Sequence, residues 1–331
     1  MTQTRLWLAT IAALLGFLTV DAYDFSVNGV YYNRTSSSTV EVTYKGSSYS
    51  DYYNKYSGAI TIPPGVTYGG CTYMVTGIGE YAFYECGSVT SIIISENVES
   101  IGMYAFYGCR ALTSITIPEK VKSLGWWTFG YCTRLNSIII PEGMTTIGYR
   151  AFSDCSSLTS TIIPSSVTNI ANCAFYGCTG ELVVNCNVPS SEEKSNGAFA
   201  ESSFSKVTIG TGVTSIGDNA FWNCSYLTSI IIPESVTSIG NSAFAECSSL
   251  ASVYINNIKA WCEINFSNQY ANPLCYASNL YLNEELVSEL YIPTTVSTVK
   301  KYAFYNCNSL TSVTIPESVT NFGSYAFEGC I

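Results

Sequence analysis

The feature that most constrains this chain is an internal repeat. The dipeptide Ala-Phe, or Thr-Phe in one copy, recurs with a spacing close to 23 residues. The phenylalanines of the repeat are Phe83, Phe106, Phe129, Phe152, Phe175, Phe199, Phe221, Phe244, Phe304 and Phe327. Because so short a unit cannot bury an apolar face by itself, stacked copies must share one continuous core. The repeat therefore predicts a solenoid rather than two or three separate globular domains.

The residues of one unit suggest how each coil is built. Ile115 and Ile117 flank a polar residue, which is typical of a short strand with two residues facing inward. Pro118 lacks a backbone N–H, so it predicts the end of that strand at a corner. Val236 and Ile239 illustrate a second apolar pair, which predicts the return side of the coil. We expect the glycine that follows this pair to permit the next turn.

These residues together resemble the BspA-like, or Treponema-type, leucine-rich repeats, whose pattern is LxxIxIPxxVxxIGxxAFxxC. The match covers about residues 57–331, and the segment 23–32 is similar to the N-terminal segment of bacterial members. The resemblance implies a β-rich solenoid, a leucine-rich-repeat superhelix of about eleven coils with a parallel sheet. It also implies a secreted or surface-attached protein that binds host matrix or plasma proteins, or other cells. The family supplies no catalytic residues.

The N-terminal residues predict export. Arg5 precedes an apolar run over 6–18, and Val20 and Ala22 place small residues before a cut at Tyr23. This arrangement is typical of a secretory signal peptide over residues 1–22. Asp21 stops the run short of a membrane span, and no transmembrane segment is expected further along. We therefore expect an extracellular or cell-surface location.

Three further segments complete the predicted organisation. Residues 23–56 are predicted to form a small β-rich N-terminal cap, and residues 57–331 the leucine-rich repeats. One coil carries an insertion within residues 256–289, and the last repeat ends at Ile331 before its next strand begins. Because insertions in solenoids bulge from one face, this insertion is a candidate binding region, and it contains the large aromatic residue Trp261.

Composition argues against several functions. The chain contains no histidine, so catalysis and metal binding that depend on histidine are excluded. Its net charge is −10 with only 14 lysines and arginines, which makes a nucleic-acid partner unexpected. No GxGxxG, P-loop or GxSxG motif occurs, and no CxxC pair is present. We therefore predict neither an enzyme nor a site for a cofactor or metal.

The first strand of each coil offers a candidate binding surface. The residue between the two inward-facing ones should point outward on the concave sheet. Read coil by coil, this row is Ile93, Thr116, Ile139, Ile162, Asn185, Thr208, Ile231, Tyr254, Tyr291 and Thr314. Exposed isoleucine and tyrosine suit a contact surface, because tyrosine provides rigid contact area at low entropic cost. The alternative is that these residues are simply good strand formers.

The cysteines fall into two groups. Nine lie three residues after a repeat phenylalanine: Cys86, Cys109, Cys132, Cys155, Cys178, Cys224, Cys247, Cys307 and Cys330. A cysteine at one inward position of every coil is expected to be a small buried thiol with a weak S–H donor. The others lie off this position, and Cys262 and Cys275, which lie within the inserted segment, are the candidate disulfide.

Three functions remain open at this stage. The leading hypothesis is an adhesin-like protein that binds extracellular matrix or cell-surface proteins through the repeat face. The first alternative is a glycan-binding module, in which Trp261 would stack on sugar rings. The second is a structural spacer that holds a further C-terminal domain away from the cell.

Overall fold

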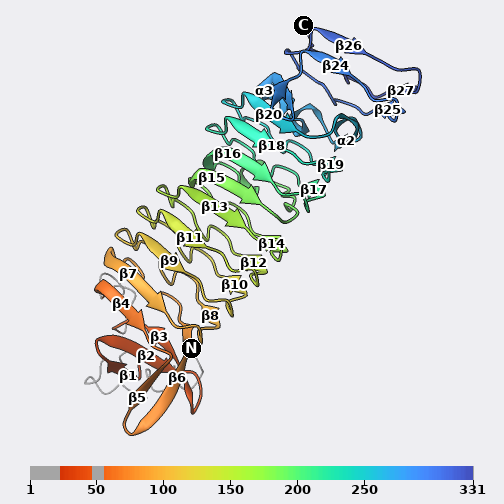
Figure 1. The fold of residues 1–331 in the computed structure, drawn as a ribbon. Helices are drawn as coiled ribbons and strands as arrows, with labels where there is room; N and C mark the ends of the chain where they lie inside the picture. Colours follow the sequence, from red (N-terminus) through yellow and green to blue (C-terminus); the bar gives the residue numbers. More distant parts are fainter. Residues whose placement is uncertain (1–22, 47–55, 331) are drawn as a thin grey trace.

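A computed structural model describes residues 23–46 and 56–330 of the chain. The chain winds into an elongated stack of coils, and the strands nearest the N-terminus form a β-rich structure at one end of it (Figure 1). The predicted solenoid with parallel sheets is confirmed, with about 11 turns. The predicted signal peptide lies outside the described residues, so it stays a prediction.

Each coil contributes one longer strand to the first side of the solenoid. We call these the first strands: β4 (Ser57–Ile62), β7 (Ser88–Ile94), β9 (Ser114–Thr116), β11 (Ser137–Ile139), β13 (Ser160–Ile163), β15 (Thr179–Val184), β16 (Ser203–Ile209), β18 (Ser229–Ile231), β20 (Ser252–Ile255), β22 (Asn279–Leu282), β24 (Glu289–Tyr291) and β26 (Ser312–Thr314). Where neighbouring first strands pair, they do so in parallel, with a shift of register at Gly58/Ala59 in β4 and at Gly180/Glu181 in β15. Within β9, Ile115 is buried and both of its neighbours are exposed, as a period of two requires.

A second ladder of very short strands forms the return side. These return strands are β8 (Ser100–Ile101), β10 (Ser123–Leu124), β12 (Thr146–Ile147), β14 (Asn169–Ile170), β17 (Ser215–Ile216), β19 (Ser238–Ile239), β21 (Asn265–Phe266), β25 (Thr298–Val299) and β27 (Asn321–Phe322). In each of the first six, an outward polar residue precedes a buried leucine or isoleucine. The return ladder is interrupted between β14 and β17.

The N-terminal end is closed by strands that do not follow the repeat. They are β1 (Phe25–Val27), β2 (Val30–Arg34), β3 (Thr39–Thr43), β5 (Gly65–Tyr68) and β6 (Cys71–Ile78). β1, β2 and β3 pair antiparallel, and β3 then pairs in parallel with β6, which pairs with β8. The return ladder therefore continues into this antiparallel sheet and leaves no open strand edge at that junction.

Two segments depart from the repeat. In the coil before Gly197 no regular return strand is formed: Val188 makes an isolated bridge to Ile216, and a 3-10 turn, η2 (Lys194–Asn196), follows it. The inserted segment contains α2 (Ile258–Cys262), η3 (Gln269–Ala271) and α3 (Leu274–Ala277), followed by β23 (Glu285–Leu286), which pairs antiparallel with β22. The extra residues of this segment thus form short helices and a hairpin.

The core is a ladder of stacked phenylalanine rings. From Phe83 to Phe244 each ring stacks on the next, with centroids 5.1–5.4 Å apart. The ladder begins on Tyr56, whose ring lies 4.6 Å from that of Phe83, and resumes after the insertion with Phe304 and Phe327. Each coil thus covers a ring of its neighbour, which explains why one unit could not bury its apolar face alone.

The ladder cysteines connect one coil to the next. The Sγ of Cys132 donates to the carbonyl of Phe106 in the preceding coil at 3.2 Å, and Cys178 donates in the same way to Phe152 at 2.9 Å. All fourteen cysteines are free, and of the nine on the ladder only Cys330 is not fully buried. The prediction of free thiols at these positions is confirmed. Seven of the nine thiols donate in this way to the phenylalanine carbonyl of the preceding coil, and so satisfy a carbonyl that faces the core.

The repeat glycine has a different role from the one expected. Gly240 does not have a positive φ. A Cβ at this position would collide with the backbone of Asp218 in the preceding coil, and one at Gly148 would collide with Leu124 and Gly125. The positive φ values instead belong to the residue before the repeat Ala-Phe, such as Tyr104 with φ 56°. Glycine is therefore needed for close approach of the coils rather than for a turn.

The phenylalanine ladder predicts where the fold is sensitive. Replacing Phe175, which is fully buried between two rings, with alanine should lower the free energy of unfolding by about 3–5 kcal/mol, because it leaves a cavity. The exposed Thr116 provides the control, and Thr116→Ala should change stability little. Urea denaturation followed by circular dichroism measures both. Equal losses would show that the two positions do not differ in their packing.

Burial also predicts the reactivity of the thiols. Desolvation raises the pKa of Cys109, Cys132 and Cys247 well above the ordinary value, so these thiols stay protonated and unreactive. At pH 8 a thiol reagent should label the exposed Cys71 in the native chain, and the ladder cysteines only after unfolding. The same pKa shifts affect stability. The thiols of the unfolded chain lose their protons near about pH 8.5, whereas those of the folded chain keep them. The free energy of unfolding should therefore fall as the pH rises above that value. Mass spectrometry of the labelled peptides shows which cysteines react with the thiol reagent. Rapid labelling of Cys132 in the native chain would contradict the labelling prediction.

Candidate binding surfaces

The outward side chains of the first strands form a row that we call the first-strand face. Ile93, Ile139 and Ile162 are all exposed, with 65% of Ile93 accessible. Thr116 and Thr314 are exposed too, whereas Thr208, Ile231 and Tyr254 are half-buried. The chain therefore exposes isoleucine side chains to solvent on several coils, all on the same side of the solenoid. This is the geometry from which a contact surface could be built.

The structure corrects one member of this row. Ile162 pairs with Val183, and Val183 pairs with Thr208, so Val183 occupies the position predicted for Asn185. Seven positions separate Cys155 from Ile162, but only five separate Cys178 from Val183. The coil is thus two residues shorter at its first corner, and counting 23 residues from Ile162 overshoots. The adjacent outward row correspondingly contains Glu181, paired with Lys206.

A second correction concerns the tyrosines near the insertion. Tyr254 pairs with Tyr281, and their rings stack with centroids 4.7 Å apart. Tyr281 was not foreseen, because the inserted segment hides its strand from a count of the repeat. Tyr291 lies on β24, which pairs with β26, so it is not the next residue of the same ladder. The face therefore carries a stacked tyrosine pair and, beyond a hairpin, a separate exposed tyrosine.

Charge on the first-strand face is sparse. Tyr291 is 63% exposed, and its hydroxyl donates to Oε2 of Glu289 at 3.0 Å. This hydrogen bond and the adjacent carboxylate raise the pKa of Tyr291, so it remains a neutral hydroxyl at physiological pH. Glu181 and Lys206 are the other charged side chains paired on the outward rows described above. A partner for such a face would be recognised through shape and apolar contact more than through charge.

Trp261 is not a surface residue. It is 1% exposed, and its Nε1 donates to the carbonyl of Ala303 at 2.7 Å. Its ring packs edge-on against Phe266, with centroids 5.3 Å apart. The interpretation of Trp261 as a platform for sugar rings is therefore wrong. It fills the core where the phenylalanine ladder is interrupted.

The candidate disulfide of the insertion is also absent. Cys262 is a buried free thiol on α2, and Cys275 is a partly buried free thiol on α3. Burial raises the pKa of Cys262 to about 12 and that of Cys275 to about 11. The two cysteines lie on separate short helices, and each behaves as a small apolar residue there.

An aromatic edge that sequence reasoning missed lies at the Ala-Phe corners of the early coils. Tyr104 stacks on Tyr81 at 5.1 Å and on Trp127 at 6.5 Å. The guanidinium of Arg150 continues this stack, 5.1 Å from the ring centroid of Trp127 and 4.8 Å from that of Tyr176. The signal was available, since large residues recur just before the Ala-Phe dipeptide. Because these groups cover one another's faces, we interpret the edge as structural.

Other kinds of site receive no support from the described residues. No group of three or more cysteine, aspartate or glutamate side chains is placed to hold a metal ion in the part of the chain that the structure describes. Among these same residues, no helix has the length and apolar character to cross a membrane.

The fold and the repeat define a leucine-rich-repeat solenoid. The family model described as the BspA type leucine rich repeat region matches in six copies over residues 52–182, 154–272 and 276–331. These matches cover most of the sequence, so the chain belongs to the BspA-type leucine-rich-repeat family. No curated protein matches the chain.

Several solved structures are similar in fold. A leucine-rich repeat protein from Bacteroides ovatus is 26% identical, with 93% of each chain covered and a TM-score of 0.46. A T. pallidum leucine rich repeat protein is 21% identical, covering 69% of this chain and 80% of its own, with a TM-score of 0.40. A leucine rich cell surface protein from Faecalibacterium prausnitzii is 21% identical over 92% of this chain and 97% of its own, with a TM-score of 0.33.

The buried position of Trp261 gives a direct test. Trp261→Ala should lower the free energy of unfolding by about 3–5 kcal/mol, because a large core ring is lost. Trp126 is 56% exposed and serves as the matched control, since Trp126→Ala removes the same side chain from the surface. Thermal unfolding of both variants measures the difference. A Trp261→Ala protein as stable as the Trp126→Ala protein would contradict the assignment.

Proposed function

We propose that this chain is an exported, adhesin-like protein that binds extracellular proteins through the first-strand face. The observation that carries the proposal is the row of exposed isoleucines on one side of the solenoid, on the first strands β7, β11 and β13. Ile93, Ile139 and Ile162 lie at equivalent positions of separate coils, and all three point away from the core. A soluble chain gains nothing in folding stability from apolar side chains that stay exposed, so a repeated exposed row suits an interaction surface.

The rigidity of the solenoid supports this role. The exposed residues are carried on strands whose inner faces are fully buried, as Leu182 and Val207 show between the outward residues of β15 and β16. A surface held this firmly loses little conformational freedom when a partner binds. An elongated row of coils also offers an extended surface, as repeat proteins commonly do.

Location at the cell surface is the second part of the proposal. It rests on the predicted signal peptide over residues 1–22 and on membership of the repeat family. One protein of similar fold is described as a cell surface protein. The partners proposed are matrix or other cell-surface proteins, and no catalytic step forms part of the proposal.

The binding face can be tested by placing charge on it. The double variant Ile139→Asp, Ile162→Asp should lose at least tenfold in binding to immobilised matrix and plasma proteins, because buried carboxylates in the contact would be unpaired. The control is Ser123→Asp, Asn169→Asp, which adds the same charge to outward positions of the return strands. Surface plasmon resonance of the full chain, with albumin as the reference surface, provides the measurement.

Two results would reject the proposal. The first is binding to matrix and plasma proteins that is no stronger than binding to albumin. The second is an equal loss of binding in both double variants. That result would show that the added negative charge weakens binding wherever it is placed, and not that the first-strand face makes the contact. Circular dichroism of each variant separates lost binding from lost fold.

A further inference from the structure

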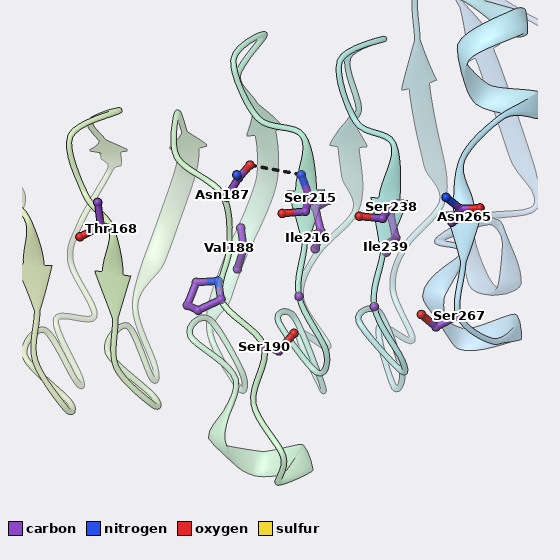
Figure 2. Close-up of a pocket in the computed structure, with 13 residues that line it drawn as sticks. Thr168, Asn187, Val188, Ser190, Ser215, Ile216, Ser238, Ile239, Asn265 and Ser267 are labelled. Carbon is purple, nitrogen blue, oxygen red and sulfur yellow. Dashed lines mark hydrogen bonds between the residues drawn. The ribbon is translucent and has the colours of Figure 1, made fainter.

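A groove lies on the return side of the solenoid, opposite the first-strand face. It has a volume of about 470 Å³ and runs across the coils that contain β14, β17, β19 and β21. Residues 187–190 and 215–217 line one part, and residues 238–240 with Asn265 and Ser267 line the other. Figure 2 shows the labelled side chains following one another across neighbouring strands.

The groove exists because the return ladder is broken there. The chain at 187–190 replaces a regular return strand and makes a single bridge, between Val188 and Ile216. It is held by the side chain of Asn187, whose Oδ1 accepts hydrogen bonds from the backbone of Thr214 and Ser215 at 2.8 and 3.2 Å. Its other end is formed by the inserted segment, which supplies Asn265 and Ser267. Both departures from the repeat therefore shape the same groove.

Three polar side chains that line the groove are available to bind a ligand. Ser215, Ser238 and Asn265 occupy the same outward register on three neighbouring strands, so they form a straight row at strand spacing, about 4.8 Å. Their side chains make no hydrogen bond to any described residue. Ser190, by contrast, is already used, because its Oγ accepts from the backbone of Asp218 at 3.0 Å. A row of unused donors and acceptors thus crosses the floor.

The chemistry of the lining selects the kind of ligand. No charged residue lines the groove, and its polar side chains are hydroxyls and amides. Hydroxyl and amide groups both donate and accept, which matches the hydroxyls of a sugar. Glu192 and Glu193 are exposed on the adjoining segment, and the whole chain carries a charge of −10. These charges disfavour an anionic ligand.

We propose that this groove binds a neutral saccharide chain, lying along the solenoid axis across β17, β19 and β21. Successive sugar residues would meet Ser215, Ser238 and Asn265 in turn, since the spacing of the strands is close to the length of one sugar residue in an extended chain. A peptide fits less well, because the groove offers no charged partner and its isoleucine side chains, Ile216 and Ile239, are buried in the core. This site is independent of the first-strand face.

The test places a large side chain in the groove and leaves the buried residues of the core unchanged. The full chain is applied to an array of neutral oligosaccharides, acidic oligosaccharides and extended peptides. Neutral oligosaccharides should be bound selectively, and Ser238→Tyr should reduce that signal at least tenfold by occupying the groove. The matched control is Ser123→Tyr, at the same outward position of β10, which does not line this groove. The control should bind as the unaltered chain does.

A milder variant keeps the test valid if the tyrosine disturbs the coil. Asn265→Ala removes one amide from the row and should weaken binding of the same oligosaccharides, while Ser123→Ala should not. Absence of binding to neutral oligosaccharides, selective binding of acidic glycans or peptides, or equal losses in groove and control variants would each overturn the proposal. Loss of matrix-protein binding in the Ile139→Asp, Ile162→Asp variant reports the other face, so failure of one proposal is distinguishable from failure of the other.

Discussion

The whole structure depends on contact between one coil and the next. Each repeat phenylalanine is covered by the ring of a neighbouring coil, and in most coils its carbonyl accepts a hydrogen bond from the cysteine thiol of the following coil, as Phe106 does from Cys132. The close approach that these contacts need explains the glycine, because a side chain at Gly148 or Gly240 would strike the backbone of the preceding coil. Rings, thiols and glycines thus act together, and none of them would be stabilising in an isolated unit.

This dependence on neighbours explains where the chain can vary. Inward positions are fixed by packing on both sides, so Phe175 and Leu182 are fully buried. Outward positions are free, and they differ between the two sides of the solenoid. The first-strand face carries exposed isoleucine and tyrosine, whereas the return side carries serine, threonine and asparagine. One scaffold can therefore present two surfaces of different chemistry, one suited to protein and the other to a neutral polar ligand.

Prediction from the sequence succeeded wherever the repeat stayed regular. The 23-residue period located the strands, the inward phenylalanines and the buried thiols, because each follows from one stacking geometry. It failed where a coil changed length. Two residues missing after Cys178 moved Val183 into the place expected for Asn185, and the insertion concealed the strand that carries Tyr281. A strand that slips by an even number of residues keeps its inward and outward pattern, so the sequence offered no warning.

By itself the sequence determined the architecture, since a short apolar unit repeated many times has no other way to bury its surface. Only the tertiary structure decided where the residues that depart from the repeat lie. Trp261 appeared suited to a surface, but the interrupted ladder leaves a space in the core that its ring fills. The groove residues of the two departures from the repeat, 187–190 and 265–267, lie 75 to 80 positions apart in the chain, yet they meet at one groove, because each coil advances the chain by only about 4.8 Å.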